Sequence, residues 1–298
     1  MEIEMKEFIK KNAKSICTAG LIVCLVLFIS IALGITPGDV FGNLIHVGKY
    51  DEETNYSSGV TSYDNLESEQ KDELSQNEDK TGDSITYEEF ISNPPEFDGE
   101  HMYVAVNRNR PFFTKDDKTV TDTFYSYSNL DDLGRTGIAI ANVTKSSFPE
   151  GIRQGDLSTV TPSGWKQVDT KEMFNVLLTT DNGATDHYLF NRCHQIAWAL
   201  GGSELGKENI FTGTLSCNLT MRLFEKSIWD FLDTAKDDHV LYRVTPVFKG
   251  DELIPRGVLL EAYAVEAKGL FIDFCQYVFN AQPGFEIDYK TGDVTLTN

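Results

Sequence analysis

The chain has 298 residues, and its 46 acidic against 26 basic side chains give a formal net charge of −20, which argues against a polyanionic partner. Hydrophobic residues make up 41% and aromatic residues 11% of the sequence, so a fibrous or wholly disordered protein is excluded. Five cysteines without a CxxC pair exclude a disulfide-stapled miniature domain and a zinc finger of the usual spacing.

The N-terminal region contains an uncharged run of twenty residues, 16–35. As a helix rising about 1.5 Å per residue, this run can cross a hydrocarbon layer of about 30 Å. Lysines precede it and acidic residues dominate the stretch after it, so the positive-inside rule places residues 1–15 in the cytoplasm. The alternative is a cleaved signal peptide, because Ala32 and Gly34 form a small-x-small pair. We therefore expect either a membrane-anchored protein with an extracellular body or a secreted one.

Residues 36–83 are polar and acidic and contain almost no aliphatic side chains, which predicts a disordered tether. Residues 84–298 carry 31 acidic and 19 basic side chains, a formal charge of −12. We expect these residues to form the folded domain. The tether and the N-terminal tail explain only part of the acidity.

Within the folded part, the apolar runs at 102–107 and 134–144 predict strands. Residues 187–200 begin with the pattern of a strand and become compatible with a helix. From Asn218 to about Ala235, apolar side chains recur at intervals of three and four residues, which predicts an amphipathic helix.

The C-terminal part reads as strands joined by turns. Residues 239–248 and 258–267 predict a strand pair, and residues 285–297 predict a hairpin across Thr291-Gly292. The predicted fold class is therefore α+β, a mainly antiparallel sheet with few helices.

The strongest candidate for chemistry is His194, which follows Asn191-Arg192-Cys193 where an apolar strand ends. A neutral imidazole can take a proton from water at neutral pH, a step that phosphodiester hydrolysis needs. Asn218 can supply a hard oxygen ligand to a divalent ion, and Glu225 falls two turns further along the same helix face. On periodicity alone, an Asn and a Glu at this spacing are more often a helix cap and a surface charge than a metal site.

The sequence around His194 resembles the DRGH-type signature of the DNA/RNA non-specific endonucleases, which share the His-Me finger, a ββα-metal motif. Within that family it is similar to the membrane-anchored nucleases of DNA uptake and the secreted deoxyribonucleases of Gram-positive bacteria. The resemblance covers about residues 85–298. Besides the tetrad, it rests on six segments: 129–135, 161–165, 209–218, 239–250, 257–266 and 282–293.

The resemblance implies a role for several residues. His194 is the general base that activates water, and Asn218 is the only direct protein ligand of a hydrated Mg²⁺ ion, with Mn²⁺ as the alternative ion. Glu225 is an outer-shell partner of that ion, although it stands one residue nearer to Asn218 than the family pattern has it. Arg192 is the signature arginine and is assigned to the catalytic group.

The same resemblance assigns Arg135 and Asn209 to substrate binding and to the organisation of the site. Two positions depart from the family signature, because Asn191 replaces its Asp and Cys193 its Gly. An amide can orient a neighbouring group as a carboxylate does, so the first change is tolerable. We expect the cysteines of the folded part to be small buried thiols rather than zinc ligands.

The expected activity is Mg²⁺-dependent, non-specific hydrolysis of DNA that leaves 5′-phosphate and 3′-hydroxyl ends, and the sequence leaves open whether RNA is cut as well. The expected partners are the nucleic acid substrate and the membrane. Basic residues of the segment 108–118, together with Arg135, Arg192 and Arg222, are predicted to form a local positive cleft in the acidic domain. We expect Phe112 and Phe113 to be core residues.

Two alternatives remain at this stage. One is a catalytically silent, membrane-anchored binding or adhesion protein with a nuclease-like domain. The other is an exported toxin, which would need a delivery module that the short tether does not offer.

Overall fold

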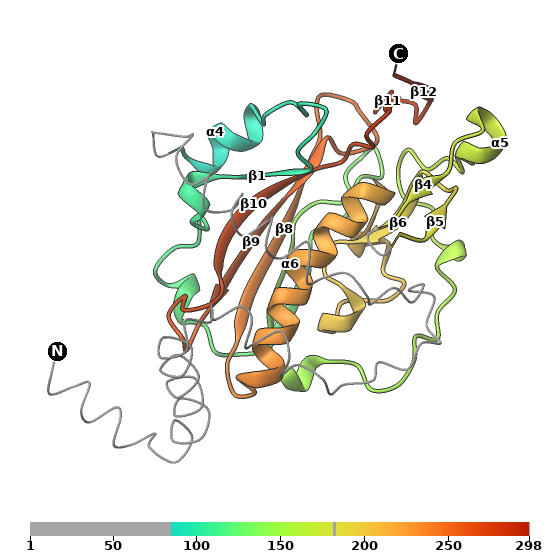
Figure 1. Ribbon diagram of the computed structural model, residues 1–298. Helices are drawn as coiled ribbons and strands as arrows, with labels where there is room; N and C mark the ends of the chain where they lie inside the picture. Colours follow the sequence, from blue (N-terminus) through green and yellow to red (C-terminus); the bar gives the residue numbers. More distant parts are fainter. Residues whose placement is uncertain (1–84, 181–182, 298) are drawn as a thin grey trace, which may run out of the picture. The chain divides into compact units, whose positions relative to one another are not determined.

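The computed structural model describes residues 85–180 and 183–297 (Figure 1). The predicted cytoplasmic segment at 1–15, membrane segment at 16–35 and tether at 36–83 lie outside the described residues. Among the helices that are described, none is both long enough and apolar enough to span a bilayer.

A six-stranded sheet, antiparallel at every pairing, forms the centre of the fold. The predicted class, a mainly antiparallel sheet with few helices, is confirmed, and so is the strand pair expected at 239–248 and 258–267. In spatial order the strands are β1 (Tyr103–Ala105), β10 (Asp273–Phe279), β9 (Gly257–Ala264), β8 (Val240–Val247), β3 (Ala139–Val143) and β2 (Phe124–Tyr127).

Three two-stranded sheets accompany the main sheet: β4 (Leu178–Thr179) with β5 (Thr185–Asp186), β6 (Phe190–His194) with β7 (Ile210–Thr214), and β11 (Phe285–Ile287) with β12 (Val294–Leu296). The predicted C-terminal hairpin is the last of these pairs. Its connection turns at Gly292, whose φ of 75° lies in the left-handed region that favours glycine.

The α-helices in the described part are α4 (Tyr87–Ser92), α5 (Thr170–Phe174) and α6 (Leu215–Thr234). Helix α6 is the predicted amphipathic helix, and it begins three residues earlier than expected. The Thr214 side chain accepts a hydrogen bond from the backbone N–H of Cys217 at 3.0 Å, so it caps the first turn.

The segment 187–200 becomes β6 and then only a single 3₁₀ turn at Trp198–Leu200. The helix-compatible pattern cannot continue, because Gly201 adopts a φ of 83° and the next N–H, that of Gly202, bonds back to the Ala197 carbonyl. A short, irregular connection therefore leads from β6 towards β7.

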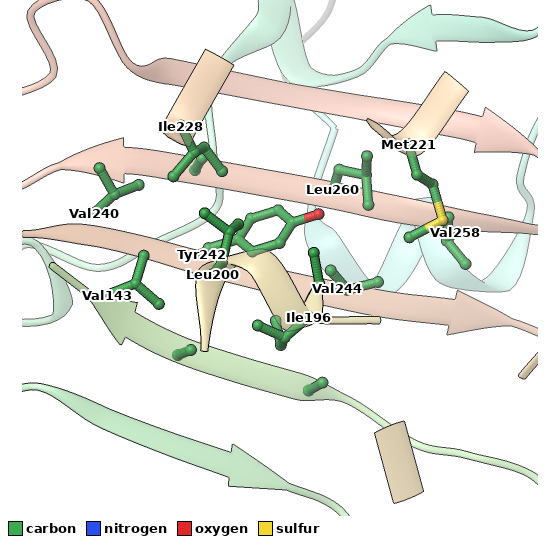
Figure 2. Packing of buried hydrophobic residues seen from close by; sticks show 14 of the residues in the cluster. Val143, Ile196, Leu200, Met221, Ile228, Val240, Tyr242, Val244, Val258 and Leu260 are labelled. Atoms are coloured by element: carbon green, nitrogen blue, oxygen red, sulfur yellow. The ribbon is translucent and has the colours of Figure 1, made fainter. Parts of the chain in front are cut away.

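Alternating side chains give the six-stranded sheet two buried faces. Helix α6 packs on one face, between the strands β8–β10 and the strand β6 (Figure 1). Figure 2 shows Met221 and Ile228 of α6 above Tyr242 of β8, with Ile196 and Leu200 from the segment after β6 below it. The helix, the sheet and the start of the β6–β7 connection thus share one core.

The other face of the sheet is covered by α4 and the segment before β2. Here Arg243 of β8 and Glu261 of β9 form an ion pair with Nε and Oε2 2.6 Å apart, and the Glu261 side chain is fully buried. Phe113 is buried on this face and Phe112 is partly buried, as expected for core residues.

Strands β2 and β10 were not expected from the sequence. Strand β10 pairs with both β1 and β9, and six of its seven residues are buried. Because both of its faces are covered, its polar Gln276 is buried beside apolar neighbours, and the strand shows no alternation between apolar and polar side chains.

The core described above predicts the cost of a cavity at Ile228, which is fully buried under α6. We expect Ile228→Ala to lower the free energy of unfolding by about 2–5 kcal/mol, measured by urea denaturation. The neighbouring exposed residue supplies the control, since Ser227→Ala should change it by less than about 0.5 kcal/mol. Equal effects of the two variants would contradict this description of the core.

Candidate active site

The candidate site is built on one continuous strand–strand–helix unit. Strand β6 pairs with β7 so that His194 lies opposite Ile210 and Phe190 opposite Thr214, and α6 follows β7 without a break. His194 therefore ends the first strand, and Asn218 lies one turn into the helix. The two residues belong to a ββα arrangement whose parts are held together by short-range connections.

Side chains alternate across β6, so Phe190, Arg192 and His194 share one face and Cys193 occupies the other. The segment 153–163 covers the first face. Arg192 Nε donates to the Val160 carbonyl at 2.6 Å, and the Arg192 guanidinium lies 3.9 Å from the centre of the Trp165 ring. These contacts anchor the signature arginine to the covering segment, two positions before the histidine on the same strand.

Asn218 lies between two apolar sides of α6. Leu215 and Leu219 pack with Phe190 in one hydrophobic cluster, and Met221 packs in the main core. At about 100° per residue, Asn218 falls between these two sides and within about 20° of Glu225. The Asn218 carboxamide is half-buried and makes no hydrogen bond to any other residue in the described part of the chain. Its oxygen is therefore available to a ligand.

Glu225 is buried, with 8% of its surface exposed, and its carboxyl is hydrogen-bonded by the backbone of Ala197. Burial raises the pKa of this carboxyl to about 8, and the nearby charge of Arg222 opposes the shift only in part. Its Oε1 has no hydrogen-bond partner within residues 85–180 and 183–297. The side chain thus supports the segment that leaves β6, three residues after His194.

His194 is the most constrained residue of the site. Its Nε2 lies 2.9 Å from the Glu204 carbonyl oxygen, and Arg153 Nη2 lies 2.7 Å from Nε2 and 3.2 Å from Nδ1. A guanidinium can only donate and a carbonyl can only accept, so one ring nitrogen cannot satisfy both. We assign the proton to Nε2, which alone reaches the carbonyl. Nδ1 then keeps the lone pair that faces Arg153.

The surroundings of His194 favour its neutral form. The residue is only 9% exposed, and this burial lowers the pKa of the imidazole to about 4, helped by the positive charge of Arg153 and opposed by Glu204. The ring is consequently unprotonated at neutral pH and able to accept a proton. Sequence reasoning missed both Arg153 and Glu204.

Asn209 is fully buried and connects the two ends of the β6–β7 connection. Its Nδ2 donates to the carbonyl oxygens of Ile196 and Ser203 at 3.0 and 2.9 Å, and its Oδ1 accepts from the Ile196 N–H at 2.9 Å. All of these partners are backbone groups. The geometry therefore fits the organising part of its expected role, and its amide points away from solvent.

Arg135 lies apart from this group. Its Nε donates to the Asp131 carboxylate at 2.7 Å, and its Nη1 donates to the carbonyl oxygens of Gly250 and Glu252 at 2.9 and 3.0 Å. These bonds tie the turn at 131–135 to the connection between β8 and β9. Of the predicted site residues, the ββα unit carries His194, Arg192, Asn209, Asn218 and Glu225, and it does not carry Arg135.

The continuous basic cleft predicted from the sequence is not formed. Arg110 pairs with Asp273, and Lys118 lies over the ring of Tyr263. Both partners project from the face of the sheet opposite to α6, because they alternate with residues of the α6-facing core. These two basic side chains are thus separated from His194 by the sheet.

The possible metal ligands near Asn218 suit an ion coordinated mostly by water better than an ion coordinated mostly by side chains. Within the described ranges, no group of three or more His, Cys, Asp or Glu side chains could hold a metal. Cys193, Cys217 and Cys275 are buried free thiols, as expected. A single unengaged carboxamide oxygen with the Glu225 carboxyl on the same helix side fits Mg²⁺, which prefers oxygen ligands and retains several waters.

A histidine at a strand end and an asparagine on the following helix, set against an antiparallel sheet, define a fold of the His-Me finger class. Residues 115–265 match the family model described as DNA/RNA non-specific endonuclease. The chain belongs to this family, so the resemblance inferred from the sequence is confirmed.

Individual relatives agree with this assignment. A deoxyribonuclease of Streptococcus dysgalactiae subsp. equisimilis is 29% identical in an alignment of 206 positions that covers 59% of this chain and 62% of the relative. The chain thus spans less than two thirds of that relative's length.

Solved structures show the same fold. The Sda1 nuclease with a bound zinc ion is 31% identical, with a TM-score of 0.50 over 58% of this chain and 82% of that one. NucA from Streptococcus agalactiae with a bound magnesium ion is 22% identical, with a TM-score of 0.52 over 65% and 86% of the two chains.

The contacts of His194 predict its titration. With ¹³C-labelled histidine rings, we expect His194 to titrate near pH 4 in NMR spectra, far below the ordinary value of 6.5. Arg153→Met should raise this pKa, because it removes the adjacent positive charge. The resonance is assigned by its loss in His194→Ala. A titration near 6.5 in both the unaltered protein and the Arg153 variant would contradict the described geometry.

The buried Glu225 carboxyl predicts a loss of stability as pH rises. The unfolded chain releases this proton near pH 4.5 and the folded chain near pH 8, so the folded state binds more protons between these values. The free energy of unfolding should fall across that window with a slope of up to about 1.4 kcal/mol per pH unit.

Glu225→Gln should remove this slope, measured by urea denaturation at several pH values. The exposed Glu286 provides the control, because Glu286→Gln leaves the buried carboxyl in place and should keep the slope. Identical pH profiles for the unaltered protein and Glu225→Gln would contradict the buried, protonated state.

Proposed function

We propose that this protein is an extracellular, Mg²⁺-dependent, non-specific endonuclease that hydrolyses phosphodiester bonds of DNA. The observation that carries the proposal is the ββα unit on which a neutral, buried His194 and the unengaged carboxamide of Asn218 occur together. The deoxyribonuclease relative and the family description support the substrate class.

His194 acts as the general base. Its Nε2–H is fixed by the Glu204 carbonyl, so Nδ1 is the nitrogen that takes a proton from water while the water oxygen attacks phosphorus. For this step the Arg153 guanidinium, which faces Nδ1 in the free protein, would turn from Nδ1 to the phosphate. The bond from phosphorus to the 3′ oxygen breaks, and this oxygen takes a proton from solvent. The products therefore carry a 5′-phosphate and a 3′-hydroxyl.

Asn218 would hold the Mg²⁺ ion through its carboxamide oxygen. When bound, the ion supplies positive charge that stabilises the negative charge developing on the phosphate. Arg153 adds a second positive charge next to His194. In this arrangement Glu225 and Asn209 hold the segment that follows β6 through hydrogen bonds with its backbone. Arg192 holds the covering segment 153–163 through its hydrogen bond to the Val160 carbonyl.

We place the enzyme outside the cell. The apolar run at 16–35 with its preceding lysines supports a membrane anchor with residues 84–298 on the outer side, and cleavage after this run would release the enzyme. Its role would then be to cut DNA for uptake, nutrition or defence.

Digestion of plasmid DNA tests the proposal. The full chain should cut supercoiled DNA with Mg²⁺ and lose this activity in EDTA. His194→Ala and Asn218→Ala should each lower the rate by at least about a hundredfold without unfolding the protein. His101→Ala is the matched control, because His101 is exposed and pairs with Asp98, outside the ββα unit.

Near-normal cleavage by either site variant would overturn the mechanism. Binding without cleavage by the unaltered protein would instead favour the second candidate, a catalytically silent binding protein. Parallel digestions of single-stranded DNA and RNA define the range of substrates. We expect cleavage of both, because contacts to the phosphate backbone do not depend on base sequence.

A further inference from the structure

Glu204 makes contacts with two residues that are 41 positions apart in the sequence, Arg153 and His194. It lies in the connection between β6 and β7, ten residues after His194. Its carbonyl oxygen is 2.9 Å from His194 Nε2, and its carboxylate Oε1 is 3.4 Å from Arg153 Nε. One residue thus touches the imidazole with its backbone and the adjacent guanidinium with its side chain.

The carboxylate of Glu204 also holds the backbone that carries Arg153. Its Oε1 accepts a hydrogen bond from the Gly155 N–H at 2.5 Å. A Cβ at position 155 would lie 2.9 Å from this same oxygen and 2.8 Å from Leu205 Cγ. A side chain at position 155 would therefore displace the Glu204 carboxylate from its contact with the Gly155 N–H.

The contact with Arg153 is ionic rather than a well-formed hydrogen bond. Arg153 Nε is buried and has no hydrogen-bond partner within the described part of the chain, although the Glu204 carboxylate is 3.4 Å away. Both side chains are largely buried, with 18% and 22% exposed, so their attraction is screened less than at the surface. Among the described residues, Glu204 is the carboxylate that forms an ion pair with Arg153.

We propose that Glu204 is a positioning residue of the nuclease site, whose carboxylate holds Arg153 beside His194 while its carbonyl selects the tautomer of the imidazole. The proposal rests on the proposed function of His194. It explains how the lone pair on Nδ1 and the neighbouring positive charge are set by a single residue. Glu204 itself touches neither water nor phosphate in this role.

The test uses Glu204→Gln in the full chain. The glutamine keeps an oxygen for the Gly155 N–H, so the backbone contact and the fold are retained, but the negative charge is lost. Glu208→Gln is the matched control, because Glu208 lies in the same connection and its side chain contacts neither Arg153 nor His194. Circular dichroism and urea denaturation verify that both variants fold.

The first readout is the His194 titration, followed by NMR as above. If Glu204 holds Arg153 in place, its loss releases the guanidinium, and the pKa of His194 should rise by about one unit or more. Loss of the negative charge alone, with Arg153 unmoved, would lower this pKa instead. A fall or no change therefore overturns the proposal, and a rise supports it.

The second readout is cleavage of plasmid DNA. Glu204→Gln should lower kcat by about tenfold to a hundredfold, because the positive charge beside the base is displaced. Combining it with Arg153→Met should add little to the effect of Arg153→Met alone, since both changes remove the same contact. Additive effects would overturn the proposal.

The two proposals fail in different ways. If His194→Ala abolishes cleavage and Glu204→Gln behaves as Glu208→Gln does, only the positioning role is wrong. If the unaltered protein does not cleave DNA at all, the proposed function is wrong, and the NMR titration still decides whether Glu204 positions Arg153.

Discussion

The packing of α6 on two partners at once is the constraint on which the site depends. One side of the helix shares the main core with the sheet, and another side shares a second cluster with Phe190 of β6. A hairpin of two five-residue strands is marginal by itself, so it needs this support. Because Asn218 lies between the two sides, the same packing that stabilises the hairpin also sets the position of Asn218 relative to His194.

The burial of His194 by two neighbouring segments determines the protonation state of its imidazole. The segment 153–163 covers the face of β6 that carries His194, and the β6–β7 connection closes around the end of the strand. Both segments are irregular, and buried side chains such as Asn209 satisfy their backbone groups. The imidazole is thereby kept neutral and given one tautomer, which a solvent-exposed histidine at the same position would not have.

Because the domain carries a net negative charge, a polyanionic substrate can bind only where positive side chains make the local potential favourable. Residues 84–298 carry a formal charge of −12, and Arg110 and Arg135 are engaged by Asp273 and Asp131. The positive charge that remains next to His194 comes from Arg153, whose own counter-ion is Glu204. The proposed recognition of phosphate therefore relies on the charge next to His194 and not on a broad basic surface.

The sequence by itself determined the elements whose signals are local. Residue spacing identified α6 and the β8–β9 pair, and the segment around His194 identified the family and the candidate pair with Asn218. Only the tertiary structure decided the partners of these residues, because the segment of Arg153 and the carbonyl of Glu204 reach His194 through long-range packing that leaves no periodic pattern. Strand β10 was not predicted either, because a strand buried on both faces shows no alternation of apolar and polar side chains.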